Sequence, residues 1–181
     1  MIKSSDKQVD IIKNNPGIIL SVSKRYKGKL FPFSVICNLP ISFDYSKDLY
    51  IHLSFTINTP ENTYNFIEGE LDKTNPYTSY TVVLKSSYAE IVNLVTPKNL
   101  RNNGFASAIL DIVSEIIIEY NNLIERQKIQ ELKDYSIISF ITGFAKSCDE
   151  EPKLNDEQLS KFYQRNGFEI DSKRNIMKVI K

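Results

Sequence analysis

The chain has 181 residues, enough for one domain with a buried core, and 41% of them are apolar, as in an ordinary globular protein. Lysine and arginine together number 23 against 22 acidic residues, and this near-neutral balance argues against a dedicated nucleic-acid binder. No stretch approaches the roughly 20 apolar residues of a membrane span, and the polar N-terminus lacks the apolar segment of a secretory signal. We therefore expect a cytoplasmic protein without a membrane partner.

Two cysteines, Cys37 and Cys148, and one histidine, His52, limit the metal and thiol chemistry. Neither cysteine belongs to a CxxC pair, so the chain lacks the ligands of the usual zinc site and we expect no metal. Two reduced thiols are the simpler interpretation, because disulfides are rare in cytosolic proteins. A bridge between the two is the alternative.

The first part of the chain predicts strands. A short apolar run at 17–22 suits a strand, and 30–37 is aromatic and β-branched, although Pro32 predicts that its start lies at a sheet edge. Residues 49–57 alternate apolar and polar side chains, as a half-buried strand does. The turn-rich stretch that follows predicts at most a short helix around 64–71.

Two further strands, 80–85 and 89–96, precede a long helix that we expect from Asn103 to about Gln130. Apolar residues recur along this helix at a spacing that places them on one face, which we interpret as core packing against a sheet. The stripe consists of Phe105, Ile109, Ile112, Ile116 and Leu123, widened by Ile117, Ile118 and Tyr120.

A strand at 136–145 comes next, followed by an acidic loop and a second helix that Asn155 caps and Gly167 ends as the C′ residue. A hairpin of 168–170 and 176–180 closes the chain. The mixture of strands and helices, without repeats or a long linker, predicts an α+β (α/β) fold in a single domain over residues 1–181.

The turn between 89–96 and the long helix is suited to holding an anion. Gly104 lets the backbone approach a ligand closely, because it has no Cβ. The N–H groups of the first helical turn lack partners within the helix, and the helix dipole adds partial positive charge there. A phosphate group is the natural occupant of such a site.

Two motifs follow one another in this half of the chain. Residues 101–106 read Arg-Asn-Asn-Gly-Phe-Ala between a strand and a long helix, and 159–168 form a helix that carries Phe-Tyr and ends in Gly-Phe. Both resemble signatures of the GNAT superfamily of acetyl-coenzyme A-dependent N-acetyltransferases, the first being its pyrophosphate loop, Arg/Gln-x-x-Gly-x-Gly/Ala. The resemblance covers about 80–181, whereas 1–79 diverges. It implies a mixed, mostly antiparallel sheet with splayed central strands flanked by helices.

The resemblance also implies an activity: transfer of an acetyl group from acetyl-coenzyme A to a primary amine by direct attack through a tetrahedral intermediate. The acceptor would be a protein lysine, a protein N-terminus or a small amine. The motif positions that would bind the cofactor are Leu94, Val95, Thr96, Arg101, Asn102, Asn103, Gly104, Phe105, Ala106, Ser107 and Asn155. For Arg101, a role as a turn cap or a solvated surface residue is the alternative.

Two residues would carry the chemistry. The resemblance implies that Tyr163 is the proton donor to the leaving thiolate. A phenol pKa of about 10 exceeds a thiol pKa of about 8.5, so the tyrosine would stay protonated. Glu90, in Ala-Glu-Ile, stands where several histone-acetylating members keep a glutamate that acts as a base through water. Each has a structural alternative: Tyr163 as a core aromatic and Glu90 as a surface glutamate.

The chain departs from the family pattern at several positions. Asn102 replaces a frequent glycine, and Asp156 and Leu159 stand where many members have asparagine and alanine. No helical period precedes residue 60, although the family usually has two helices there. A non-catalytic module that binds coenzyme A or a protein partner is therefore an alternative, as are a toxin that acetylates aminoacyl-tRNA and a phosphate binder of another fold. A homodimer is compatible with all of these.

Overall fold

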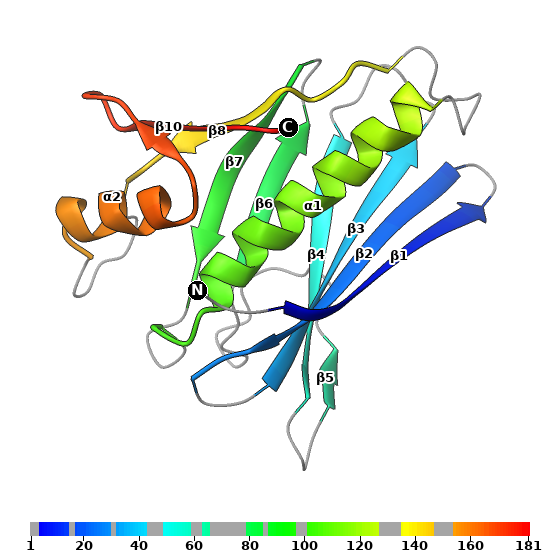
Figure 1. The fold of residues 1–181 in the computed structure, drawn as a ribbon, viewed down its shortest axis with the longest axis horizontal. Coiled ribbons are helices and arrows are strands. Elements are labelled where there is room, and N and C mark those ends of the chain that lie inside the picture. Colours follow the sequence, from blue (N-terminus) through cyan, green and yellow to red (C-terminus); the bar gives the residue numbers. More distant parts are fainter. Residues whose placement is uncertain are drawn as a thin grey trace.

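The computed structural model describes residues 4–14, 17–29, 32–42, 49–58, 63–65, 79–84, 87–96, 101–126, 135–146 and 154–181. Along the chain they form β1 (Ser4–Asn14), β2 (Gly17–Lys27), β3 (Pro32–Ser42), β4 (Leu49–Asn58), β5 (Thr63–Asn65), β6 (Ser79–Leu84), β7 (Tyr88–Val95), α1 (Phe105–Glu125), β8 (Phe140–Phe144), α2 (Asp156–Arg165), β9 (Glu169–Ile170) and β10 (Asn175–Val179) (Figure 1).

The strands form one sheet in the order β1-β2-β3-β4-β6-β7-β8-β10-β9, with β5 paired to β4. All pairs are antiparallel except β7 with β8, which are parallel. A parallel pair needs a long crossover, and α1 supplies it. Figure 1 shows α1 lying diagonally across the sheet and α2 beside β8 and β10. The predicted α+β class and mostly antiparallel sheet are confirmed.

The core lies between α1 and one face of the sheet. Along β2, side chains alternate between buried and half-buried, so that Ile18, Leu20 and Val22 face the helix. The predicted stripe of α1 is confirmed except for Ile118, which is half-buried. The buried residues of α1 are Phe105, Ala108, Ile109, Leu110, Ile112, Val113, Ser114, Ile116, Ile117, Tyr120 and Leu123.

An ion-pair network ties β1 and β2 to α1. The side chain of Lys24 is 8% exposed, and its Nζ lies 3.3 Å from Asp111 Oδ2 and 3.2 Å from Glu115 Oε1. Lys7 Nζ donates to Glu115 Oε2 at 2.6 Å and to Glu119 Oε1 at 2.7 Å. Partial burial works to raise the pKa of Glu115, but the two lysines outweigh it and hold this pKa below its ordinary value.

Both predicted ends of α2 are confirmed. Asn155 Oδ1 accepts from the backbone N–H of Gln158 at 2.8 Å, while the Asn155 N–H donates to Gln158 Oε1 at 3.1 Å, which completes a capping box. At the other end Gly167 has φ +83°, and the N–H of Phe168 donates to the carbonyl of Tyr163 at 3.1 Å. This is a Schellman motif, in which glycine takes the left-handed conformation without a Cβ clash.

Other predictions about strands need correction. Ser4–Asn14 is an edge strand that the sequence did not predict, because its side chains are mostly polar and exposed. Pro32 starts β3, which lies between β2 and β4; Pro32 pairs with Lys27 of β2, whereas the described register with β4 begins only at Ser34, so the start of β3 lies beyond that pairing, as the proline predicted. The helix expected around 64–71 is wrong at its start, since Thr63–Asn65 is a strand. Three parts of the predictions lie outside the described residues: 66–71 of the expected short helix, 127–130 of the first helix, and Cys148.

The strand predicted at 136–145 is shorter than expected, because β8 begins only at Phe140. Before β8, the side chain of Asn121 from α1 makes the hydrogen bonds to the Ile138 backbone that a neighbouring strand would otherwise make. Asn121 Nδ2 donates to the carbonyl of Ile138, and Asn121 Oδ1 accepts from the Ile138 N–H, both at 2.9 Å. Within the described ranges, neither helix has the length and apolar content that a bilayer span requires.

Candidate functional site

The loop that leads into α1 is held by its own side chains. Arg101 Nε donates to the carbonyl of Thr96 at 3.0 Å, and Asn103 Nδ2 donates to the carbonyl of Arg101 at 3.0 Å. Asn102 and Gly104 both have positive φ, at 61° and 94°. Arg101 thus closes the turn, as in one of the interpretations of its role, and Asn102 adopts the left-handed conformation that asparagine tolerates better than most residues.

The N-terminus of α1 carries no acidic or capping side chain. Gly104 is the N-cap and has no side chain to accept a hydrogen bond, and the first turn contains no acid. The N-terminus of α2 is different: the Asn155 capping box satisfies it, and Asp156 and Glu157 lie in its first turn. At the N-terminus of α2, an anion would compete with these carboxylates for the positive end of the helix dipole. At the N-terminus of α1 there is no such competition, and the dipole and the first-turn N–H groups favour anion binding.

The parallel strands β7 and β8 part beside this loop. Their pairing runs from Tyr88 with Phe140 to Ile91 with Gly143 and then stops. Beyond Ile91, β7 continues to Val95, and its partner strand there among the described residues is β6. Figure 1 shows the two strands diverging toward their C-terminal ends. At about 3.3 Å per residue, the stretch 92–95 is roughly 13 Å of strand edge for which the described residues supply no strand partner on the β8 side.

A β-bulge lies where the two strands separate. Thr81 of β6 pairs with Asn93, whereas Val82 pairs with Ile91, so Val92 is an extra residue on β7. Bulges bend a strand and increase its twist, which turns β7 away from β8. A Cβ on Gly143 would lie 3.0 Å from Ile91 Cβ, so glycine also permits the close contact at the last pair before the gap.

Leu94, Val95 and Thr96 were predicted to offer their backbone to an extended ligand, and they lie at the open end of β7. Leu94 and Thr96 are half-buried. The Thr96 carbonyl already accepts a hydrogen bond from Arg101. Unpaired strand edges accept added strands, so the edge from Asn93 to Val95, which no described strand covers on the β8 side, is the part with which an extended ligand could pair.

Glu90 lies on the sheet face that points away from α1. It pairs with Val83 of β6 and Thr142 of β8, and its side chain is exposed. Its neighbours Ala89 and Ile91 are buried in the core cluster that includes the apolar residues of α1. Side chains of adjacent strand residues point to opposite faces, so Glu90 reaches solvent one residue before the gap opens.

Tyr163 lies in the core between α2 and the end of the sheet. It is 6% exposed, and its ring packs edge-on against Phe162 and Phe168 at centroid distances of 5.1 and 5.6 Å. The Schellman motif fixes its backbone. These contacts are those of a core aromatic, which was the structural alternative to a proton donor.

The amino group of Lys178 lies between α1 and the end of α2, where the sequence suggested no site. Lys178 Nζ donates to Ser114 Oγ at 3.0 Å and lies 5.7 Å from the centre of the Phe168 ring. Burial lowers the pKa of this amine, although Asp111 and Glu115 oppose the change. The phenylalanine thus links Lys178 to Tyr163, a contact that only the tertiary fold creates.

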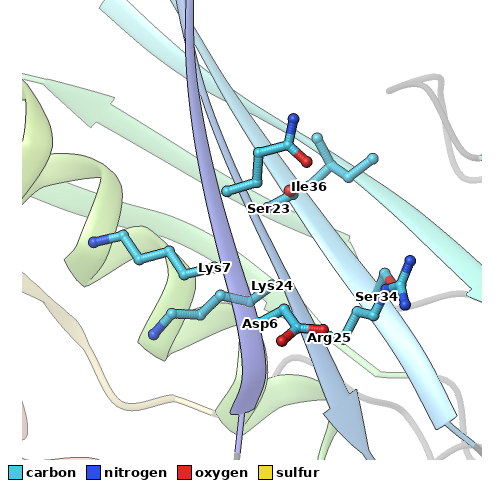
Figure 2. A pocket seen from close by; sticks show the side chains of 8 residues that line it. Asp6, Lys7, Ser23, Lys24, Arg25, Ser34 and Ile36 are labelled. Atoms are coloured by element: carbon cyan, nitrogen blue, oxygen red, sulfur yellow. The ribbon is translucent and has the colours of Figure 1, made fainter.

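The hollow shown in Figure 2 lies on β1 to β3 and includes no residue of the α1 loop, β7 or α2. Lys7 and Lys24 at its margin point toward α1, where their ion pairs lie. The rest of its lining is mostly polar. Within the described part of the chain, no group of three or more histidine, cysteine or acidic side chains could hold a metal ion.

Comparisons with models of protein families, with curated proteins and with solved structures find no match for this chain.

Proposed function

We propose that this protein is a GNAT-type N-acetyltransferase that moves an acetyl group from acetyl-coenzyme A to a primary amine. The observation that carries the proposal is the gap between β7 and β8, which opens at Ile91 and Gly143 next to a helix N-terminus preceded by Gly104. The edge of β7 beyond the bulge is followed in the chain by the anion site at the N-terminus of α1. This combination suits a ligand that has amides followed by phosphates.

The residues present fit coenzyme A. The first turn of α1 lacks acids, and Gly104 keeps a side chain away from the approach to it. Beyond the Val92 bulge, none of the described strands pairs with β7 on its β8 side. When bound, acetyl-coenzyme A would supply the acetyl thioester.

Each part of the chain then has a task. The backbone N–H groups of Ala106 and Ser107 donate to the oxygens of the pyrophosphate. Arg101 fixes the conformation of the loop by donating to the carbonyl of Thr96. The backbone of Leu94 and Val95 aligns the extended arm and offers an N–H to the developing oxyanion.

Glu90 takes the proton of the attacking amine through water. An aliphatic amine has a pKa of about 10.4, so a base near the acceptor raises the fraction that can attack. Tyr163, whose ring packs against Phe168, donates a proton to the leaving sulfur.

A second function is a module that binds coenzyme A without turnover. The burial of Tyr163 favours it, because an aromatic that is 6% exposed and packed between two phenylalanines has a sufficient structural role. Under this alternative the backbone groups of β7 and α1 still bind coenzyme A, but Tyr163 does not act as a proton donor.

The test combines calorimetric titration of coenzyme A with a thiol-release assay on acetyl-coenzyme A and a panel of amines: a lysine peptide, a peptide with a free N-terminus, a polyamine and an aminoacyl-tRNA. Binding together with amine-dependent thiol release supports the enzyme. Binding without release leaves the module as the function. No binding would sink both proposals.

A further inference from the structure

A row of side chains crosses four neighbouring strands on the sheet face opposite α1. Glu90 of β7 pairs with Thr142 of β8, Thr142 with Met177 of β10, and Met177 with Glu169 of β9. Register partners project from the same face of a sheet. The row therefore begins and ends with a carboxylate and has Thr142 and Met177 between them.

The neighbouring residues establish which face this is. Ala89 and Ile141 are buried in the core cluster that includes the apolar residues of α1, and Lys178, which pairs with Ile141, donates to Ser114 of that helix. Since strand residues alternate between faces, the row that contains Glu90 points away from α1.

This face is exposed and partly apolar. Met177 is 40% exposed, Val179 57% and Phe144 54%. The rings of Tyr88 and Phe140 stack at 5.5 Å in the adjacent row. Exposed apolar side chains gathered on one face are typical of interaction surfaces.

The charged strand residues on this face of β7 to β10 are acidic. The face's strand residues in β7 to β10 include two glutamates and no lysine, arginine or histidine, in a chain whose net charge is +1. Neither Glu90 nor Glu169 makes an ion pair among the described residues. The partner that complements the face is therefore cationic.

We infer that this face docks an extended basic segment of a protein, whose lysine is the acetyl acceptor. The inference rests on the proposed function, because the row begins at Glu90, next to the gap between β7 and β8. Strands lie about 4.8 Å apart, so the two carboxylates are roughly 14 Å apart. Two same-side residues four positions apart in an extended peptide are separated by about 13 Å, which matches this span. The apolar centre suits the residues between them.

The experiment uses Glu169, which lies at the far end of the row from the gap and is not part of the proposed chemistry. Glu169→Gln removes its charge and Glu169→Lys reverses it, while Glu125→Gln at the exposed end of α1 is the control with the same charge change. A fluorescein-labelled lysine-rich peptide is titrated by anisotropy without cofactor, beside a version with glutamate for lysine. The same peptide and a polyamine are then assayed as acceptors.

We expect Glu169→Gln to raise the Kd and KM for the lysine peptide roughly two- to fivefold, in the range of one exposed ion pair, with kcat unchanged. Glu169→Lys should have the larger effect, and Glu125→Gln none. Equal affinity for all variants, or binding of the glutamate peptide, overturns the inference. Saturable turnover of the polyamine alone also overturns it. If coenzyme A does not bind, the proposed function fails, and the anisotropy titration still decides whether the face binds a basic segment.

Discussion

Gly104 and Gly167 allow the anion site to be tested against a matched control. Both glycines adjoin a helix end and have similar positive φ, 94° and 83°. A residue with a Cβ pays about 1–2 kcal/mol in this conformation. For a chain of this length, 1 kcal/mol shifts Tm by roughly 2–4 °C, so Gly104→Ala and Gly167→Ala should each lower Tm by roughly 2–8 °C.

The control is clean because a Cβ at Gly167 meets Lys178 Cε at 3.6 Å, an ordinary contact. Its cost is therefore backbone strain alone. Coenzyme A affinity should be unchanged in Gly167→Ala and reduced in Gly104→Ala. Gly104→Glu adds a carboxylate at the proposed pyrophosphate site. Two unit charges 4 Å apart at an effective dielectric constant of about 20 repel by about 4 kcal/mol, or roughly a thousandfold in Kd.

Calorimetry supplies Kd, and thermal unfolding with and without coenzyme A supplies an independent check, since ligand at 100 times Kd stabilises the wild type by about 2.7 kcal/mol. That gain should persist in Gly167→Ala and disappear in Gly104→Glu. Wild-type affinity in Gly104→Glu would refute the loop as the phosphate site. An equal loss of affinity in the two alanine variants would refute it too, because global strain would then be the cause.

Other predictions concern single side chains. Tyr163→Phe should lower kcat and leave the Kd for coenzyme A unchanged, because it removes only the hydroxyl; unchanged kcat in the thiol-release assay removes Tyr163 from the mechanism. Glu115→Gln should reduce the decrease in the free energy of unfolding that occurs as the pH falls. The pKa of Glu115 is lowered in the folded state, so its stabilisation is present above its unfolded value of about 4.3 and is lost as pH falls toward the folded value. Urea unfolding at about pH 7 and pH 3.5 measures this difference, and equal pH dependence in both proteins contradicts the role of the lysines. Asn155→Ala should cost about 1 kcal/mol by breaking the capping box, seen as a Tm lower by roughly 2–4 °C; an unchanged Tm would mean that the cap contributes nothing.

The sequence predicted best where local chemistry decides structure. Asn155 and Gly167 are residues whose cap roles follow from side-chain acceptors and backbone freedom, and both were found in those roles. The apolar stripe of α1 likewise follows from helical spacing. These features need no knowledge of distant contacts.

Features that depend on tertiary contacts were missed. β8 begins late because the side chain of Asn121 satisfies the Ile138 backbone, and no local pattern reveals a partner 17 residues away. β1 is held by β2 and by Lys7 reaching α1, whereas its own residues are mostly polar. The bulge at Val92 is equally invisible, since it depends on how β6 aligns with β7.

The two proposed catalytic side chains lie on opposite sides of the sheet. Glu90 faces away from α1, whereas Tyr163 contacts Phe168, whose ring lies near the amine of Lys178 on the α1 side. A proton acceptor and a proton donor so separated can act on one reacting carbonyl only if it sits in an opening through the sheet. From Tyr88 to Ile91, β7 is hydrogen-bonded to β8 and leaves no opening. A reaction that uses both residues therefore occurs just beyond Ile91 and Gly143, where the bulge ends the pairing.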